Sequence, residues 1–173
     1  TVNEKSKERV FFSKAGMQQA QVKMGVTTVG RSSPDYLPLI VGMKLLGGSF
    51  KSLLNEELRV KRGLTYGVGA GVRAYSQGGA IVVSSAVRHD KLTEFVTVAE
   101  RVISDFIKRG ITQAELDKMK ALYAGEYPRS IETLEQEASL YLSYEALGFS
   151  GKEIYKFLDR IQKVTKDQVD GAM

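Results

Sequence analysis

Residues Gly47 to Gly71, GGSFKSLLNEELRVKRGLTYGVGAG, decide the fold because they contain a helix, its end and the strand that follows. Phe50, Leu54 and Leu58 recur every four residues, which is the spacing of one helical face. The spacing predicts an amphipathic helix over residues 49–61, with Phe50 on its buried side.

Both ends of this helix have recognisable caps. The Ser49 side chain can accept a backbone N–H at the helix start, and Gly63 suits the left-handed position just beyond the last turn. Lys61 and Arg62 place positive charge at the negative end of the helix dipole. We therefore expect the helix to end before Gly63.

The strand that follows has one nearly bare face. One parity carries Tyr66, Val68, Ala70, Val72 and Ala74, and the other carries Gly67, Gly69 and Gly71. Alternating glycines indicate close approach of another backbone, a packed helix or a ligand, and a tightly packed sheet is the alternative. A dinucleotide-binding loop is disfavoured, because these glycines do not open a helix.

The segment Leu58–Val68, LRVKRGLTYGV, resembles the LRExxGLAYxV signature of the C-terminal domain of pitrilysin-type zinc metallopeptidases, the insulinase or inverzincin family. Other residues fall in the family's order, namely a strand with Gln19, a helix ending in residues 46–48, and Val164-Thr165 before the final helix. The family includes the mitochondrial processing peptidase and the core subunits of the cytochrome bc1 complex. The resemblance covers most of the chain.

Strands are expected early in the chain and helices late. We expect strands at 10–12, 18–29, 66–74 and 80–87, and helices at 34–46, 49–61, 90–109, 112–123 with a bend or an end at Pro128, 132–147, 152–161 and from 165. Asp90 is an expected N-cap, and Thr112 and Thr165 begin capping-box patterns. This order predicts an α+β, two-layer domain with a mainly antiparallel sheet and helices on one face. The resemblance implies the same fold, that of the mitochondrial processing peptidase.

Composition indicates a single soluble domain. The chain has 173 residues, 43% of them apolar, and a net charge of +5 that is spread too evenly to favour nucleic acid. Cysteine is absent, which excludes a thiol nucleophile. The first residues, 1–7, are expected to be a linker. Because the chain starts without Met and stops just after a helix begins, we expect a truncated C-terminal-type domain. The sequence leaves the compartment undecided between the cytoplasm and the periplasm.

The family's zinc motif, HxxEH, is missing. The only histidine is His89, which we expect at the surface or in a cap, since a zinc site needs three or four ligands. A serine or threonine triad would also depend on His89 as its base. Glu56 and Glu57 are adjacent in sequence, so on a helix their side chains point in different directions. A role as solvated surface residues is therefore favoured over an acid–base dyad. No cofactor is expected in this chain.

Arg59 and Tyr66 are the candidate catalytic and substrate-binding residues, and the resemblance alone supplies them. In the family, residues so placed face a zinc ion held by another domain, where the guanidinium anchors a substrate carbonyl and the phenol stabilises an oxyanion. Without the family, Arg59 pairing with Glu56 or Glu57 and a core position for Tyr66 would be favoured. Thr65 stands where the family commonly has alanine.

The predicted function is therefore that of a non-zinc domain, inactive alone, in a zinc metalloendopeptidase. Its expected partners are an HxxEH-bearing zinc domain or subunit and an unfolded peptide, which could add a strand to a free sheet edge. The alternative is a non-catalytic scaffold subunit resembling the bc1 core proteins.

Overall fold

The computed structural model describes residues 10–12 and 16–173. In chain order its elements are β1 (Gln19–Val29), α1 (Tyr36–Leu46), α2 (Leu53–Asn55), the π-helix η1 (Glu56–Lys61), β2 (Thr65–Ala74), β3 (Gly78–Arg88), α3 (Leu92–Arg109), α4 (Gln113–Glu126), α5 (Leu134–Glu145), α6 (Phe157–Gln162) and α7 (Lys166–Ala172). Short 3₁₀ turns lie at His89–Lys91, Pro128–Ile131 and Gly151–Lys156. All three strands precede the run of helices from α3 onward, as the sequence predicts.

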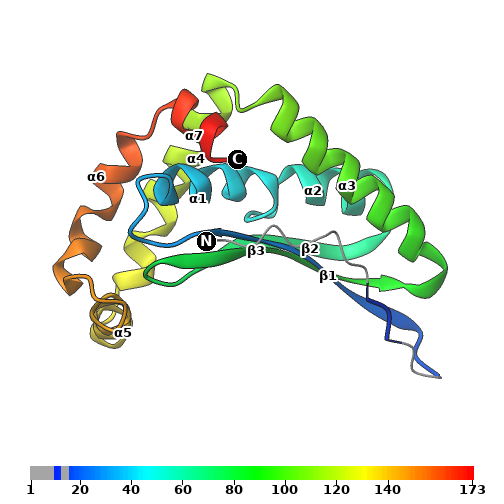
Figure 1. Cartoon of the computed structure of the whole chain (residues 1–173), viewed down its shortest axis with the longest axis horizontal. Coiled ribbons are helices and arrows are strands. Elements are labelled where there is room, and N and C mark those ends of the chain that lie inside the picture. The colour runs from blue at the N-terminus through cyan, green and yellow to red at the C-terminus, as the bar shows by residue number, and fades with distance from the viewer. Residues whose placement is uncertain (1–9, 13–15) are drawn as a thin grey trace.

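The three strands form one antiparallel sheet in the order β1-β3-β2. Ser85 of β3 lies opposite Val22 of β1 on one side and Val68 of β2 on the other. In Figure 1, helices α1, α2, α3, α4 and α7 lie on one side of this sheet. The predicted α+β, two-layer architecture is confirmed.

Helix α1 is the centre of the core. Its Leu39, Met43 and Leu46 are each at most 2% exposed, as its helical spacing predicts. It packs against β2 on one side and against α4 and α7 on the other. Because it is covered from both sides, even Gly42 is enclosed, and a Cβ there would lie 2.6 Å from the sulfur of Met173.

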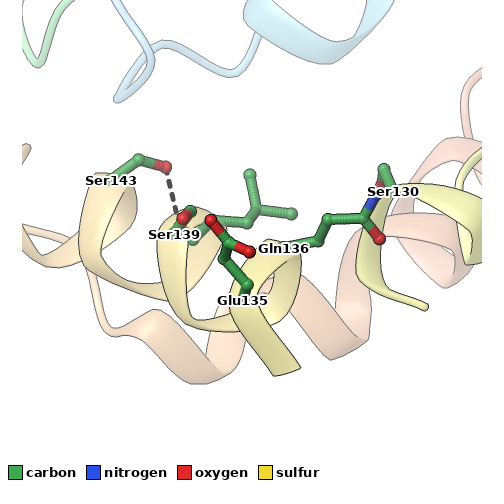
Figure 2. Close-up of a pocket in the computed structure, with 6 residues that line it drawn as sticks. Ser130, Glu135, Gln136, Ser139 and Ser143 are labelled. Carbon is green, nitrogen blue, oxygen red and sulfur yellow. Dashed lines mark hydrogen bonds between the residues drawn. The ribbon is translucent and has the colours of Figure 1, made fainter. Parts of the chain in front are cut away.

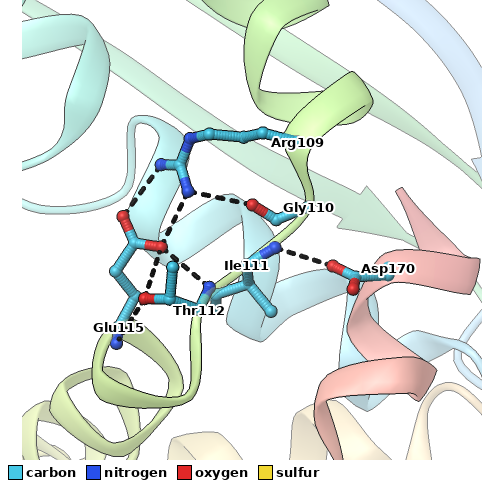
Figure 3. Close-up of polar contacts among 6 residues, drawn as sticks. All are labelled: Arg109, Gly110, Ile111, Thr112, Glu115 and Asp170. Atoms are coloured by element: carbon cyan, nitrogen blue, oxygen red, sulfur yellow. Dashed lines mark hydrogen bonds and ion pairs between the residues drawn. The ribbon is translucent and has the colours of Figure 1, made fainter.

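The junction between α3 and α4 is tied to the C-terminal helix (Figure 3). Gly110, the residue that follows α3, adopts φ +69°, a backbone conformation that favours glycine. The next N–H, that of Ile111, donates to Asp170 of α7 at 2.7 Å. Arg109 donates to both carboxylate oxygens of Glu115, at 2.8 and 2.9 Å. This junction is therefore held by charge-assisted hydrogen bonds from two directions.

The helix of the defining stretch begins later than predicted. Ser52, rather than Ser49, is the N-cap, because the Ser52 N–H bonds to the Ser49 carbonyl and residues 49–52 form a turn. Phe50 consequently lies outside the helix and is 69% exposed, so its predicted place on the buried face is wrong. Leu54 and Leu58 are fully buried, and Gly63 has the expected positive φ of +59°.

Smaller departures concern other ends of elements. Residues 10–12 are exposed and form no strand, contrary to expectation. Asp90 lies in a 3₁₀ turn, and Lys91 takes the N-cap position of α3. The capping boxes begun by Thr112 and Thr165 are both present. The expected linker, residues 1–7, lies outside the described residues. Within the described part of the chain, no helix has the length and apolarity needed to cross a membrane.

Candidate functional site

A single buried side chain, Asn55, fixes the geometry around the candidate residues. Its amide accepts from the Val68 N–H at 3.0 Å and donates to the Val68 carbonyl at 3.0 Å, as a neighbouring strand would. It also donates to the Ser49 carbonyl at 3.1 Å and to the Ser52 hydroxyl at 3.2 Å. Asn55 thereby joins the helix to strand β2 and to the turn that carries Phe50.

These contacts cover part of the β2 edge. The backbone groups of Val68 that face away from β3 are bonded to Asn55, and the Ala70 N–H donates to the Gly47 carbonyl at 2.9 Å. An antiparallel strand exposes every second residue along its edge, so these two residues occupy consecutive outward positions. A peptide therefore cannot add a strand to this stretch of β2.

Arg59 lies in the π-helical segment η1. Its neighbour Leu58 is fully buried, whereas Arg59 is partly exposed. The Arg59 carbonyl accepts the N–H groups of Arg62 and Gly63, so the segment closes at the predicted glycine. Short π-helical segments are rare and are frequent at functional sites.

Arg59 contacts a ring and no carboxylate. Its Cζ lies 4.3 Å from the centroid of the Phe50 ring. Among the described residues it makes no ion pair and no side-chain hydrogen bond. The expected alternative, pairing with Glu56 or Glu57, is therefore not formed.

Glu57 is occupied by other cations instead. It accepts from Lys61 at 3.1 Å, from Arg62 at 3.2 Å and from Arg101 of α3 at 3.2 Å. The hydrogen bond from Lys61, together with that from Arg62, lowers the pKa of Glu57 below its usual range. The carboxylate is thus an ion-pair centre that links η1 to α3, in keeping with the predicted surface role.

Tyr66 is 90% exposed near the start of β2, which excludes the expected alternative of a core position. The pairing register of β2 with β3 shifts between Thr65 and Val68, so Tyr66 lies on a β-bulge. Bulges commonly re-aim a side chain out of the regular strand pattern. The structure packs η1 against β2, but no contact joins the side chains of Arg59 and Tyr66 in the described part of the chain.

The bulge is held by Thr65 and Ser85. The Thr65 hydroxyl lies 2.8 Å from that of Ser85 and donates to the Ala86 carbonyl at 2.9 Å. Ser85 in turn donates to the Gly67 carbonyl at 2.9 Å, and the Gly67 N–H donates to Thr65 at 3.1 Å. Alanine, which the family commonly has at position 65, could make none of the bonds of the Thr65 hydroxyl.

The glycine face of β2 is open. A Cβ built at Gly69 or at Gly71 would meet no atom within 4 Å. The expected close packing within the chain is therefore absent at these two glycines. Gly69 lies opposite Ser84, which lies opposite Lys23 of β1, and these three residues are all exposed.

Sequence reasoning missed Asn55, Phe50 and the Thr65–Ser85 pair as parts of this site. Asn55 was detectable in part, because it precedes Leu58 by three residues and so shares the buried stripe of the helix. A buried amide needs hydrogen-bond partners, which here are the strand and the turn. The other contacts join residues from different elements and leave no local signal.

The described residues do not fit a zinc site. They contain no group of three or more histidine, cysteine, aspartate or glutamate side chains that could hold a metal. His89, the only histidine of the sequence, is exposed at the start of a 3₁₀ turn.

A shallow hollow runs along α5 (Figure 2). It is lined by Ser130, Glu135, Gln136, Ser139, Leu140 and Ser143. The Ser143 hydroxyl donates to the carbonyl of Leu140, as Ser and Thr commonly do inside helices. In Figure 1, α5 lies at one end of the molecule, away from α2.

Comparisons with known proteins agree with the fold and the motif. Residues 1–123 match the family model described as the peptidase M16 inactive domain. The non-peptidase homolog YmxG of Helicobacter pylori is 29% identical over 97% of this chain and 39% of its own length. An uncharacterized zinc protease of Mycobacterium tuberculosis is 28% identical over 90% of this chain and 35% of its own length.

A solved structure gives the same result. The peptidase M16 inactive domain from Pseudomonas fluorescens has a TM-score of 0.77 and 27% identity, over 91% of this chain and 37% of that one. The chain thus spans between 35% and 39% of the length of these relatives. Since the family model covers residues 1–123 of 173, well over half of the chain, this protein belongs to the peptidase M16 family of zinc metallopeptidases and corresponds to its inactive domain.

Proposed function

We propose that this domain supplies Arg59 and Tyr66 to a zinc metalloendopeptidase whose metal is held by another domain or subunit. The proposal rests chiefly on one observation. Arg59 and Tyr66 lie on two elements that Asn55 locks together, and neither side chain has a hydrogen-bond partner within residues 10–12 and 16–173. Perturbed or unsatisfied polar groups held in fixed positions are candidates for binding and catalysis.

Arg59 would bind the peptide. A guanidinium is always charged and donates from several N–H groups in one plane, so it suits a carbonyl or carboxylate of an extended peptide. Here the guanidinium lies near the phenyl ring of Phe50, which accepts none of those N–H groups in a conventional hydrogen bond. No internal ion pair would have to break before substrate binds.

Tyr66 would stabilise the oxyanion that develops on the substrate carbonyl during hydrolysis. A phenol donates one hydrogen bond, and such donors are most effective when they are already oriented. The bulge bonds of Thr65 and Ser85 fix the backbone on both sides of Tyr66. The side chain itself is exposed and therefore accessible to a substrate held by a second domain.

Because the chain spans only 35–39% of its relatives, the partner is proposed to be the remaining part of a longer protein or a separate subunit. That partner would carry the HxxEH helix. An unfolded peptide would then bind between the two parts, with contacts to Arg59 and Tyr66 rather than to the blocked stretch of the β2 edge.

The test is Tyr66→Phe in the protein that combines this domain with its zinc-bearing part. Loss of one oxyanion donor should lower kcat for an unfolded peptide by about 100- to 1000-fold, with zinc content unchanged. Tyr75→Phe is the matched control, since Tyr75 is 68% exposed at the far end of the same strand. Full activity of Tyr66→Phe would contradict the oxyanion role.

A scaffold function is the second candidate. It is favoured by the Helicobacter pylori relative, whose name states that it is not a peptidase and which matches 97% of this chain. The two functions differ in the partner, because a scaffold needs no HxxEH helix in either the rest of the protein or an associated subunit. Absence of hydrolysis by the complete wild-type assembly would support the scaffold.

A further inference from the structure

Phe50 is a large apolar side chain that the core does not use. It is 69% exposed and lies in the turn before α2, although its spacing from Leu54 predicts a place in the core. Single exposed apolar residues are common and need no explanation by themselves. What distinguishes Phe50 is its contact, since its ring centroid lies 4.3 Å from the Cζ of Arg59.

The turn that carries Phe50 is held by backbone hydrogen bonds before it and within it. Before it, the N–H groups of Gly47 and Gly48 both donate to the Met43 carbonyl at 3.0 Å. Within the turn, the Ser49 carbonyl accepts from the Asn55 side chain at 3.1 Å, and Asn55 also binds β2. The ring therefore belongs to the same rigid unit as the strand that carries Tyr66.

An arginine without a fixed partner moves among many rotamers, and ordering it on binding costs conformational entropy. A cation over an aromatic face is attracted without use of its N–H donors. We propose that Phe50 is a positioning residue that holds the Arg59 guanidinium in place for the peptide. This inference rests on the proposed function and names a further residue of the same site.

The kinetic test uses the complete zinc-bearing protein. Phe50→Ala and Phe50→Leu should each lower kcat/KM by about two- to fivefold, whereas Phe50→Tyr, which keeps the ring face, should retain wild-type activity. In an Arg59→Ala background, Phe50→Ala should have no further effect, because the residues act through one contact. Leu142→Ala, which removes a 65% exposed apolar side chain from α5, is the control.

A second measurement is independent of catalysis. In this chain labelled with ¹⁵N-arginine, the Nε–H signal of Arg59 should be displaced by the ring current of Phe50. That displacement should disappear in Phe50→Leu and persist in Phe50→Tyr.

The outcomes separate the two proposals. Loss of activity in Phe50→Ala that persists undiminished in the Arg59→Ala background would overturn positioning and indicate direct substrate contact by Phe50. An Arg59 signal unchanged in Phe50→Leu would also overturn it. If Arg59→Ala hydrolyses the peptide as fast as wild type, while the Arg59 signal of the wild-type chain is displaced, the proposed peptide-binding role of Arg59 is refuted. The contact between Phe50 and Arg59 would then still stand.

Discussion

Two arginines of this domain each lie near a phenylalanine ring but differ in their hydrogen-bond partners. Arg59 lies 4.3 Å from the ring of Phe50, and Arg109 lies 5.3 Å from the ring of Phe106. Phe106 is 2% exposed and belongs to the core, whereas Phe50 is 69% exposed. Arg109 also donates to both oxygens of Glu115 and to the Gly110 carbonyl (Figure 3), and Arg59 has no carboxylate within the described part of the chain.

The difference separates a structural arginine from an available one. Hydrogen bonding to Glu115 raises the pKa of Arg109, and the same bonds lower the pKa of Glu115 to about 2. A guanidinium so engaged has its charge paired with a carboxylate and several of its N–H donors already used. Within residues 10–12 and 16–173 Arg59 has no such ion pair, which is the physical reason for placing it in a binding site.

The strongest test compares the two arginines directly. Arg59→Ala should lower kcat/KM of the complete protein by about 100-fold, since charge-assisted hydrogen bonds contribute about 1.5–3 kcal/mol, and should leave its thermal midpoint almost unchanged. Arg109→Ala should reduce the free energy of unfolding by about 1–3 kcal/mol and leave activity per folded molecule unchanged. Peptide hydrolysis and denaturant unfolding on both variants measure the contrast.

The comparison would break down if the two variants behaved alike. A large loss of stability in Arg59→Ala, with activity in proportion to the folded fraction, would make Arg59 a second structural arginine. Loss of activity in Arg109→Ala at full stability would place the α3–α4 junction in the site.

A second test concerns the residue that holds the elements carrying Arg59 and Tyr66. Asn55→Ala would leave the N–H and carbonyl of Val68, itself 4% exposed, without their partners. We expect the free energy of unfolding to fall by about 2–6 kcal/mol, because two buried groups lose their partners and each costs about 1–3 kcal/mol. Activity should fall by more than the decrease in the folded fraction accounts for, because the elements that carry Arg59 and Tyr66 lose the side chain that joins them.

The measurement is denaturant unfolding paired with hydrolysis under conditions where the variant is fully folded. Asn55→Asp is the informative control, because it keeps the acceptor for the Val68 N–H and loses the donor for the carbonyl. Wild-type stability in Asn55→Ala would show that the turn and strand are held by packing alone.

Local patterns predicted much of this architecture. The left-handed Gly63 and the capping boxes at Thr112 and Thr165 depend on residues within a few positions of one another. Each of these features is therefore readable without knowledge of the tertiary structure.

The features that were missed or wrongly placed depend on distant residues. Phe50 has helical spacing, but the turn over 49–52 and the π-helix after it displace it from the buried face. Glu57 was an expected partner for Arg59, but Arg101, 44 residues further on, helps to occupy it. Whether Gly69 and Gly71 face a packed layer or open space is likewise decided by where helices lie, which no strand pattern encodes.

The smallest expected effect is a pH dependence of stability. Of the two arginine sites compared, only that of Arg109 should show it. Glu115 has a folded pKa of about 2, below its ordinary value of 4.5, so its stabilising contribution is present above pH 4.5 and is lost as the pH falls from there toward 2. After allowance for partial exposure, the contribution at neutral pH should be about 1 kcal/mol. Glu115→Gln should therefore be less stable than wild type at pH 7, and the difference should shrink as the pH falls toward 2. The paired variant Arg59→Ala should differ in stability from wild type equally at both pH values, because Arg59 makes no ion pair with a carboxylate of the described residues. A difference for Arg59→Ala that closes in the same pH window would reveal an acidic partner and remove the basis for calling its guanidinium available.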